Sequence, residues 1–154
     1  MSEAANPFIG CTCFSLRKLS RTVTRLYDQH LATAGLKTTQ YSLLKNIAYE
    51  PLPIAQLAER LSTERTTLTR NLKPLIDAGW VKLKAGDDSR QRIPTITAAG
   101  LDTIKQAKQA WKRAQIELQK TMGEQAVRDL HAQLETALQQ LTPLIEEHAH
   151  AKSN

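Results

Sequence analysis

A cluster of arginine and threonine side chains lies in the middle of the chain, just after a short apolar segment. Arg65, Thr66 and Thr67 come first. An arginine can donate two parallel hydrogen bonds to a guanine, and a threonine can bond to a base or place its methyl group against that of thymine. The same segment continues with three side chains that are better placed to contact phosphates: Thr69, Arg70 and Lys73. These six side chains are candidates for contacts with double-stranded DNA.

A second basic group lies in a polar turn further along the chain. Arg90 and Arg92 are close in sequence to Asp87 and Asp88. The acidic residues could orient an arginine, which would then enter a narrow minor groove because its negative potential attracts cations. A surface hairpin with local ion pairs, each worth under about 1 kcal/mol, would show the same residue types. The position soon after the first cluster favours the DNA contact.

The elements that would position the first cluster are two helices joined by a tight turn. Residues 54–61 have apolar side chains at helical spacing, and Ser62 or Thr63 can cap a second helix that runs over Glu64–Ala78 until Gly79 stops it. In a helix-turn-helix, the second helix lies in the major groove with its N-terminal side chains on base edges. A solvated helical face with ordinary capping threonines is the alternative reading.

The elements that would position the second group are two short strands. Side chains alternate with a period of two in residues 81–84 and 92–97, on either side of the polar turn. This pattern predicts a two-stranded hairpin, in which Pro94 confines its strand to an edge. A hairpin directly after a helix-turn-helix is a wing. An RNA-binding winged helix is disfavoured because aromatic residues, on which single-stranded RNA readers stack bases, make up only 5% of the chain.

Long helical segments flank this unit on both sides. Their apolar residues recur at alternating spacings of three and four. Residues at this spacing form a stripe on one side of the helix, called a seam here, which typically packs against a partner helix. The economical reading is a homodimer clamped by the terminal helices. The sequence therefore predicts a mainly α fold with a small two-stranded β-wing: a winged helix-turn-helix at 38–100, N- and C-terminal dimerisation helices at 8–34 and 101–148, and tails at 1–7 and 149–154.

The composition limits the classes of protein that the chain can represent. Its 154 residues fit one domain of ordinary size, and 41% of them are hydrophobic, enough for a buried core. Residues 17–120 hold 19 of the 21 basic residues and nine acidic ones, which favours a polyanionic partner for this part. We expect a cytoplasmic protein without membrane contact, because no apolar run approaches the ~20 residues of a membrane span and no signal peptide opens the chain.

Enzymatic and metal sites are not expected. The sequence contains no G-x-S-x-G, P-loop or H-E-x-x-H pattern, and its acidic residues are scattered. A metal site could be formed by two cysteines and two histidines, namely Cys11, Cys13, His148 and His150. This is disfavoured because thiols at i and i+2 point to different faces of a helix and because the histidines are distant in sequence. We therefore expect no metal, no other cofactor, and reduced thiols.

Several short elements follow one another in a familiar order. They are Leu61-Ser62, Leu68-Thr69-Arg70, Leu72, Leu75, Gly79-Trp80-Val81, Asp88-Ser89-Arg90 and Ile96-Thr97-Ala98-Ala99-Gly100. With them the chain resembles the MarR family of bacterial transcriptional regulators. The resemblance implies a homodimeric winged-helix protein, most often a repressor, which a small effector or thiol oxidation releases from a pseudo-palindromic operator. It also implies that Glu64–Ala78 is the recognition helix and Arg90 the wing arginine, while Pro74 departs from the pattern and should bend the helix.

One switch that the resemblance implies is a ligand pocket between the dimer helices and the winged domain, where the family binds aromatic or phenolic acids. The candidates to line it are Phe14, Arg17, Tyr41, Leu44 and Trp111. Arg17 could pair with the carboxylate of such an effector. Each of these residues is also an ordinary core or surface residue. We expect this ligand-operated switch.

The alternative switch is Cys13, which sits where the peroxide-sensing branch of the family carries its reactive cysteine. Oxidation of a thiolate to a sulfenic acid would disturb the dimer core, and Arg17, one turn along, could stabilise that thiolate. That branch supports its thiol with several tyrosines, whereas here only Tyr27 remains and Arg17 and Thr39 stand at the other two places. A free cysteine is also commonly a small buried hydrophobe.

Overall fold

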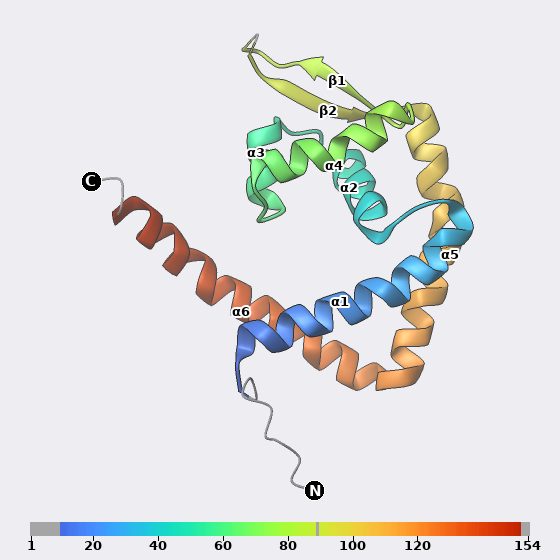
Figure 1. Cartoon of the computed structure of the whole chain (residues 1–154), viewed down its shortest axis with the longest axis vertical. Coiled ribbons are helices and arrows are strands. Elements are labelled where there is room, and N and C mark those ends of the chain that lie inside the picture. Colours follow the sequence, from blue (N-terminus) through green and yellow to red (C-terminus); the bar gives the residue numbers. More distant parts are fainter. Residues whose placement is uncertain (1–9, 89, 152–154) are drawn as a thin grey trace, which may run out of the picture. The chain divides into compact units, whose positions relative to one another are not determined.

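The computed structural model of the chain describes residues 10–88 and 90–151 and is mostly helical (Figure 1). This architecture confirms the predicted mainly α fold with a two-stranded wing. The elements follow in the order α1 (Thr12–Leu31), the short 3-10 helix η1 (Ala32–Ala34), α2 (Thr38–Tyr49), α3 (Ile54–Arg60), α4 (Arg65–Asp77), β1 (Val81–Ala85), β2 (Arg92–Ile96), α5 (Ala98–Met122) and α6 (Glu124–Ala151).

The ends of the chain differ in part from the expectation. The first helix begins at Thr12, whereas the apolar pattern predicts a start near residue 8. The tail predicted for 1–7 lies outside the described residues, and so do 152–154. Helix α6 runs through 149–151, which the sequence assigns to the other tail. Within the described part of the chain, none of the helices is long and apolar enough to cross a membrane.

The chain divides into two compact units, Met1–Ala114 and Gln115–Asn154. The core of the first unit forms where α2, α3, α4 and the hairpin meet. Burying a leucine or isoleucine side chain contributes about 1.5–3 kcal/mol, so the apolar spacing of these short helices fixes which of their faces turn inward. The most deeply buried side chains are Leu31, Leu44, Ile47, Leu57, Leu68, Leu72, Leu75, Val81 and Pro94.

The turn between α3 and α4 differs from the sequence prediction. Ser62 has a left-handed backbone with φ of 47°, and its N–H donates to the carbonyl of Glu59. Thr63 N–H donates to the carbonyl of Ala58 at 3.0 Å. The N-cap of α4 is Glu64, which makes no capping bond with its side chain. The expectation that Ser62 or Thr63 caps α4 is therefore wrong, because the turn uses both residues to end α3.

The start of α2 is tied to α1 by one carboxylate. Asp28 Oδ1 accepts hydrogen bonds from the backbone N–H and the Oγ1 of Thr38, both at 2.6 Å. The N-cap is Lys37, whose N–H donates to Gln40 Oε1 at 2.9 Å. Thr38 and Thr39 are good N-caps by residue type, but Thr38 is already the first residue of α2 and its hydroxyl bonds to Asp28 of α1.

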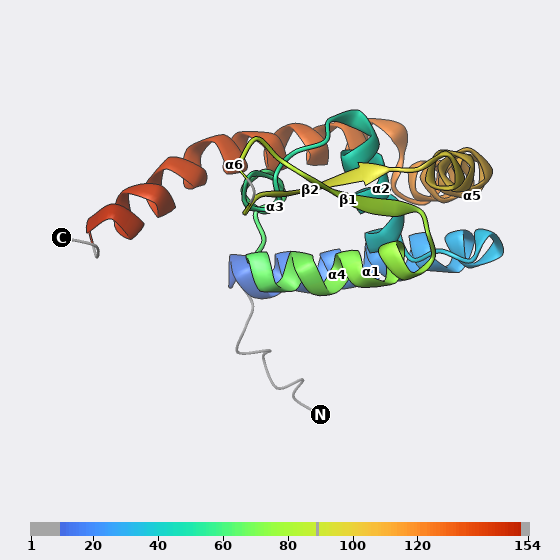
Figure 2. The same ribbon diagram turned by 90° about the horizontal axis from the view of Figure 1, so that it is seen from above.

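The hairpin leaves the end of α4 and returns to the start of α5 (Figures 1 and 2). Its strands pair antiparallel, with Val81 opposite Ile96 and Leu83 opposite Pro94. The root of the hairpin is closed by the carbonyl of Trp80, which accepts the N–H of Thr97 at 3.0 Å and its Oγ1 at 3.1 Å. These bonds tie the wing to the first residues of α5.

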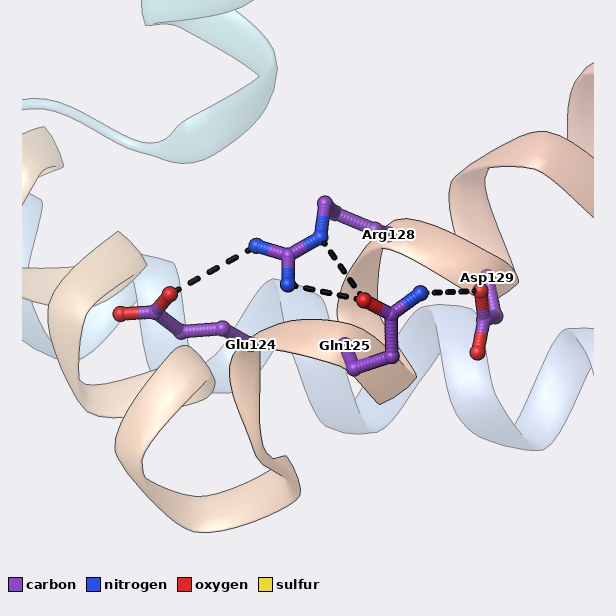
Figure 3. Close-up of polar contacts among 4 residues, drawn as sticks. All are labelled: Glu124, Gln125, Arg128 and Asp129. Carbon is purple, nitrogen blue, oxygen red and sulfur yellow. Dashed lines mark hydrogen bonds and ion pairs between the residues drawn. The ribbon is translucent and has the colours of Figure 1, made fainter.

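The second unit contains the end of α5 and all of α6. On the first turns of α6, four polar side chains form hydrogen bonds and an ion pair with one another (Figure 3). Arg128 Nη2 donates to Gln125 Oε1 at 2.9 Å, and Gln125 Nε2 donates to Asp129 Oδ1 at 2.8 Å. Glu124 lies 3.5 Å from Arg128, and its charge at this end complements the helix dipole. Gly123 separates α5 from α6.

Candidate nucleic-acid interface

The exposed face of α4 carries most of the residues predicted to contact DNA. Leu68 and Leu75 on the opposite side are buried, and Gly79 with φ of 73° ends the helix as predicted. Because the apolar side of α4 packs into the core, its polar side faces solvent along the length of the helix. Five exposed candidates line a single hollow of about 950 Å³ beside β1, namely Arg65, Thr66, Thr69, Arg70 and Lys73.

Local contacts on α4 distinguish these side chains from one another. Thr69 Oγ1 donates to the carbonyl of Arg65 at 2.8 Å, which leaves its methyl group and lone pairs for other contacts. Lys73 Nζ is 2.8 Å from Asp77 Oδ2, an exposed pair worth under about 1 kcal/mol that a phosphate could displace. The sixth candidate, Thr67, is half-buried and lines a separate hollow at the α3–α4 turn.

The hairpin presents the other two candidates, Arg90 in its turn and Arg92 at the start of β2. Arg90 and Arg92 are both exposed. Asp88 Oδ1 accepts the backbone N–H of Arg90 at 2.9 Å, and the carbonyl of Asp88 accepts the N–H of Gln91 at 2.9 Å. The acidic residue thus fixes the main chain from which the Arg90 side chain projects.

A separate cavity of about 530 Å³ lies between α1, α2 and α5. Its size suits a small organic molecule. The Tyr41 and Trp111 rings, 6.5 Å apart between centroids and inclined by 34°, form one wall. Burial raises the pKa of both Tyr27 and Tyr41, so their phenols are neutral at physiological pH. The lining consists of Tyr27, Thr38, Tyr41, Ser42, Lys45, Asn46, Ile104, Lys105, Lys108 and Trp111.

Two of the five residues predicted for an effector pocket line this cavity, Tyr41 and Trp111. Leu44 is fully buried in the core, and Phe14 and Arg17 lie in the first half of α1 outside the lining.

The sequence prediction missed the three lysines of this cavity. For two of them, the spacing from an aromatic residue in the sequence would have indicated a place beside the predicted pocket residues. Lys45 follows Tyr41 by four residues, and Lys108 precedes Trp111 by three, so in each case a cation and an aromatic ring share one helix face. The third lysine, Lys105, is 3.7 Å from Asp102.

The two cysteines lie at the start of α1. Cys11 precedes the helix and Cys13 is in its first turn, and both are exposed. Arg17 is exposed one turn further along. Both thiols are therefore accessible to a solute.

Comparison with known proteins is consistent with this arrangement. A family model described as the MarR family matches residues 34–91. The transcriptional regulator MosR of M. tuberculosis, solved in complex with DNA, is 34% identical with a TM-score of 0.72, over 85% of this chain and 98% of that chain. A mutant MarR from E. coli, solved with operator DNA, has the same fold at 22% identity and a TM-score of 0.78, over 87% of this chain and 99% of that chain.

A curated relative is also similar. The uncharacterized HTH-type transcriptional regulator YwoH of Bacillus subtilis (strain 168) is 26% identical over 83 residues, which are 53% of this chain. The match spans 61% of the length of that relative.

Proposed function

Because the chain belongs to the MarR family of transcriptional regulators, we propose that it represses transcription by binding a pseudo-palindromic operator as a homodimer, and that a small aromatic acid releases it. The observation that carries the proposal is the exposed polar face of α4, with five candidate DNA contacts along one hollow beside a basic wing. We place the protein in the cytoplasm, where its DNA target lies.

In this proposal α4 enters the major groove with its N-terminal turn foremost. Arg65, Thr66 and Thr67 then meet base edges, where a bidentate arginine–guanine pair discriminates by about 1–3 kcal/mol. The next turns, with Thr69, Arg70 and Lys73, follow the phosphates and set the register of the helix. The wing places Arg90 in the adjacent minor groove, with Arg92 near the backbone.

The exposed apolar side chains of α6 support a homodimer. They recur along one helix at spacings of three and four, the spacing of a seam that packs against another helix. A symmetric dimer would present two α4 helices to half-sites about one helical turn of DNA apart. The apolar side chains that a second copy would cover are Leu134, Leu138, Leu141, Leu144 and Ile145.

The cavity between α1, α2 and α5 is the proposed effector site. The rings of Tyr41 and Trp111 would hold the aromatic ring of the ligand, and Lys45 or Lys108 would pair with its carboxylate. The site joins α2, which packs against α4, to α5, which follows the wing. A ligand that binds better to a conformation with a displaced α4 would shift the protein towards that conformation and away from DNA.

The test begins with duplex DNA from upstream of the gene and its neighbours, located by footprinting. Arg65→Ala should lower operator affinity and relax base preference at a few positions, whereas Arg21→Ala removes the same side chain from α1 and should leave both unchanged. Arg90→Ala should weaken binding through the minor groove. Equal affinity of the parent and both interface variants for the operator would refute the proposed interface.

The ligand arm of the test uses benzoate-type acids. They should release the parent protein from the operator, and Trp111→Ala should need a higher concentration for the same release while keeping its DNA affinity. Release at an unchanged concentration would exclude the cavity as the effector site.

A thiol switch is the second candidate, and the exposure of Cys13 favours it. Peroxide would transfer one oxygen to the thiolate, giving a sulfenate and water. Equimolar peroxide should then release DNA from the parent protein, and Cys13→Ser should keep its DNA affinity but lose the response. We expect the ligand outcome, in which Cys13→Ser and the parent respond alike.

A further inference from the structure

A small polar notch lies between the start of α2 and the middle of α4. Its volume is about 320 Å³. Two cations from different helices line it, Lys37 and Arg70, and both are exposed. Arg70 also lines the larger hollow beside β1, so the notch adjoins the proposed DNA interface. The remaining lining residues are Thr39, Gln40, Asn71 and Pro74.

The residue type at position 37 is unusual for its place in the fold. Lys37 is the N-cap of α2, where serine, threonine, aspartate and asparagine are preferred. A cation near the positive end of a helix dipole is unfavourable, so helix formation does not explain a lysine here. Residues that break a local structural rule are expected at functional sites.

The acidic groups around the notch leave both cations available. Asp28 is the carboxylate at this end of α2, and its Oδ1 is occupied by the N–H and hydroxyl of Thr38. Among the side chains of residues 10–88 and 90–147, neither Lys37 nor Arg70 has an ion-pair partner within 4.0 Å. Two unneutralised cations beside amide and hydroxyl groups match the charge and hydrogen-bonding capacity of a phosphate.

We propose that the notch binds one phosphate of the DNA backbone per subunit, on the strand that flanks the major groove entered by α4. The inference rests on the proposed DNA binding and adds Lys37 and Asn71 to the residues that hold the DNA. Lys37 reaches the phosphate from α2, and Arg70 and Asn71 reach it from α4. Gripping one phosphate from two helices fixes how α4 is seated in the groove, independently of base sequence.

The experiment measures binding of duplex DNA against salt concentration by fluorescence anisotropy. Each neutralised phosphate contributes about 0.9 to the slope of log K against log salt. Because Arg70 keeps part of the contact, Lys37→Gln in a dimer should reduce the slope by at most about 1.8, on operator and scrambled DNA alike. Lys112→Gln removes the same charge from an exposed position on α5 and should leave the slope unchanged. The Tm of Lys37→Gln should equal or slightly exceed that of the parent, because the variant removes an unfavourable charge from the N-terminus of α2. A retained Tm separates lost contact with DNA from lost folding.

A second arm identifies the phosphate. Neutral methylphosphonates placed singly along the operator should reveal a position in each half-site where neutralisation weakens the parent but no longer weakens Lys37→Gln. An unchanged salt slope for Lys37→Gln would overturn the proposal, while loss of affinity in Arg65→Ala on the same DNA would leave the proposed function standing. Failure of the parent to bind any duplex would overturn both. Saturable binding of inorganic phosphate that Lys37→Gln abolishes, with no change in the salt slope, would make the notch a site for free anions and overturn its role on DNA.

Discussion

Replacing Gly100 with alanine would place a methyl group where the root of the wing meets α5. A Cβ at this position would overlap the main-chain oxygen of Trp80 and lie 2.5 Å from Cδ1 of Ile96. The isoleucine could turn aside. The carbonyl of Trp80 cannot retreat freely, because it accepts two hydrogen bonds from Thr97.

The expected magnitude follows from three opposing contributions. Alanine is favoured over glycine inside a helix by about 1 kcal/mol. Inserting a methyl group into a filled space costs about 1–3 kcal/mol, and losing the Thr97 bonds to Trp80 costs about 1 kcal/mol each. Gly100→Ala should therefore lower the free energy of unfolding by about 2–4 kcal/mol, which corresponds to a fall in Tm of about 4–16 °C for a chain of this length.

The measurement is thermal unfolding at one fixed protein concentration, because the proposed homodimer would make Tm depend on concentration. Gly123→Ala is the matched control. A Cβ there has no atom within 4 Å, so only its backbone with φ of 89° opposes the change, at about 1 kcal/mol. A Tm for Gly100→Ala equal to or above that of the parent would refute the close packing inferred at the wing root.

Three further predictions concern other parts of the chain. Asp28→Ala removes the acceptor of both hydrogen bonds from Thr38 and should lower the free energy of unfolding by about 2–3 kcal/mol; an unchanged urea midpoint would contradict this. Burial raises the pKa of the Tyr27 and Tyr41 phenols above 10.0, so their contribution to stability is present below pH 10 and is lost as the pH rises through the folded pKa; Tyr41→Phe should flatten the decline measured above pH 10. Leu141→Asp should shift sedimentation towards the monomer, since it places a charge in the proposed seam, and an unchanged dimer would exclude that residue from it.

The helices and the wing could be predicted because each has its own periodic pattern of apolar side chains along the sequence. Apolar spacing locates α4 between the polar turn and Gly79, and the alternation in 81–84 locates β1. The helix caps could not be predicted in the same way. Thr38 is a good cap by residue type, but Asp28 on a neighbouring helix takes its hydroxyl, and only the packing of α1 against α2 places the two side by side.

The cavity between α1, α2 and α5 could be predicted only in part from the sequence, for a similar reason. Tyr41 and Trp111 were predicted from residue type and from a resemblance, and the packing of α2 against α5 brings their rings together. Leu44 has the same apolar character as a pocket residue, yet its helical position turns it into the core. Distance along the chain carries no information about which faces of two helices will meet.

The closed root of the hairpin has a mechanical consequence. Thr97 bonds to the carbonyls of Gly79 and Trp80, and its Oγ1 also accepts the N–H of Gly100, so the wing has no free joint where it meets α5. The same α5 continues to Trp111 in the wall of the cavity between α1, α2 and α5. With this rigid connection, a rotation of α5 at the cavity would be passed on to the hairpin, and the tip that carries Arg90 would move through a longer arc than α5 itself.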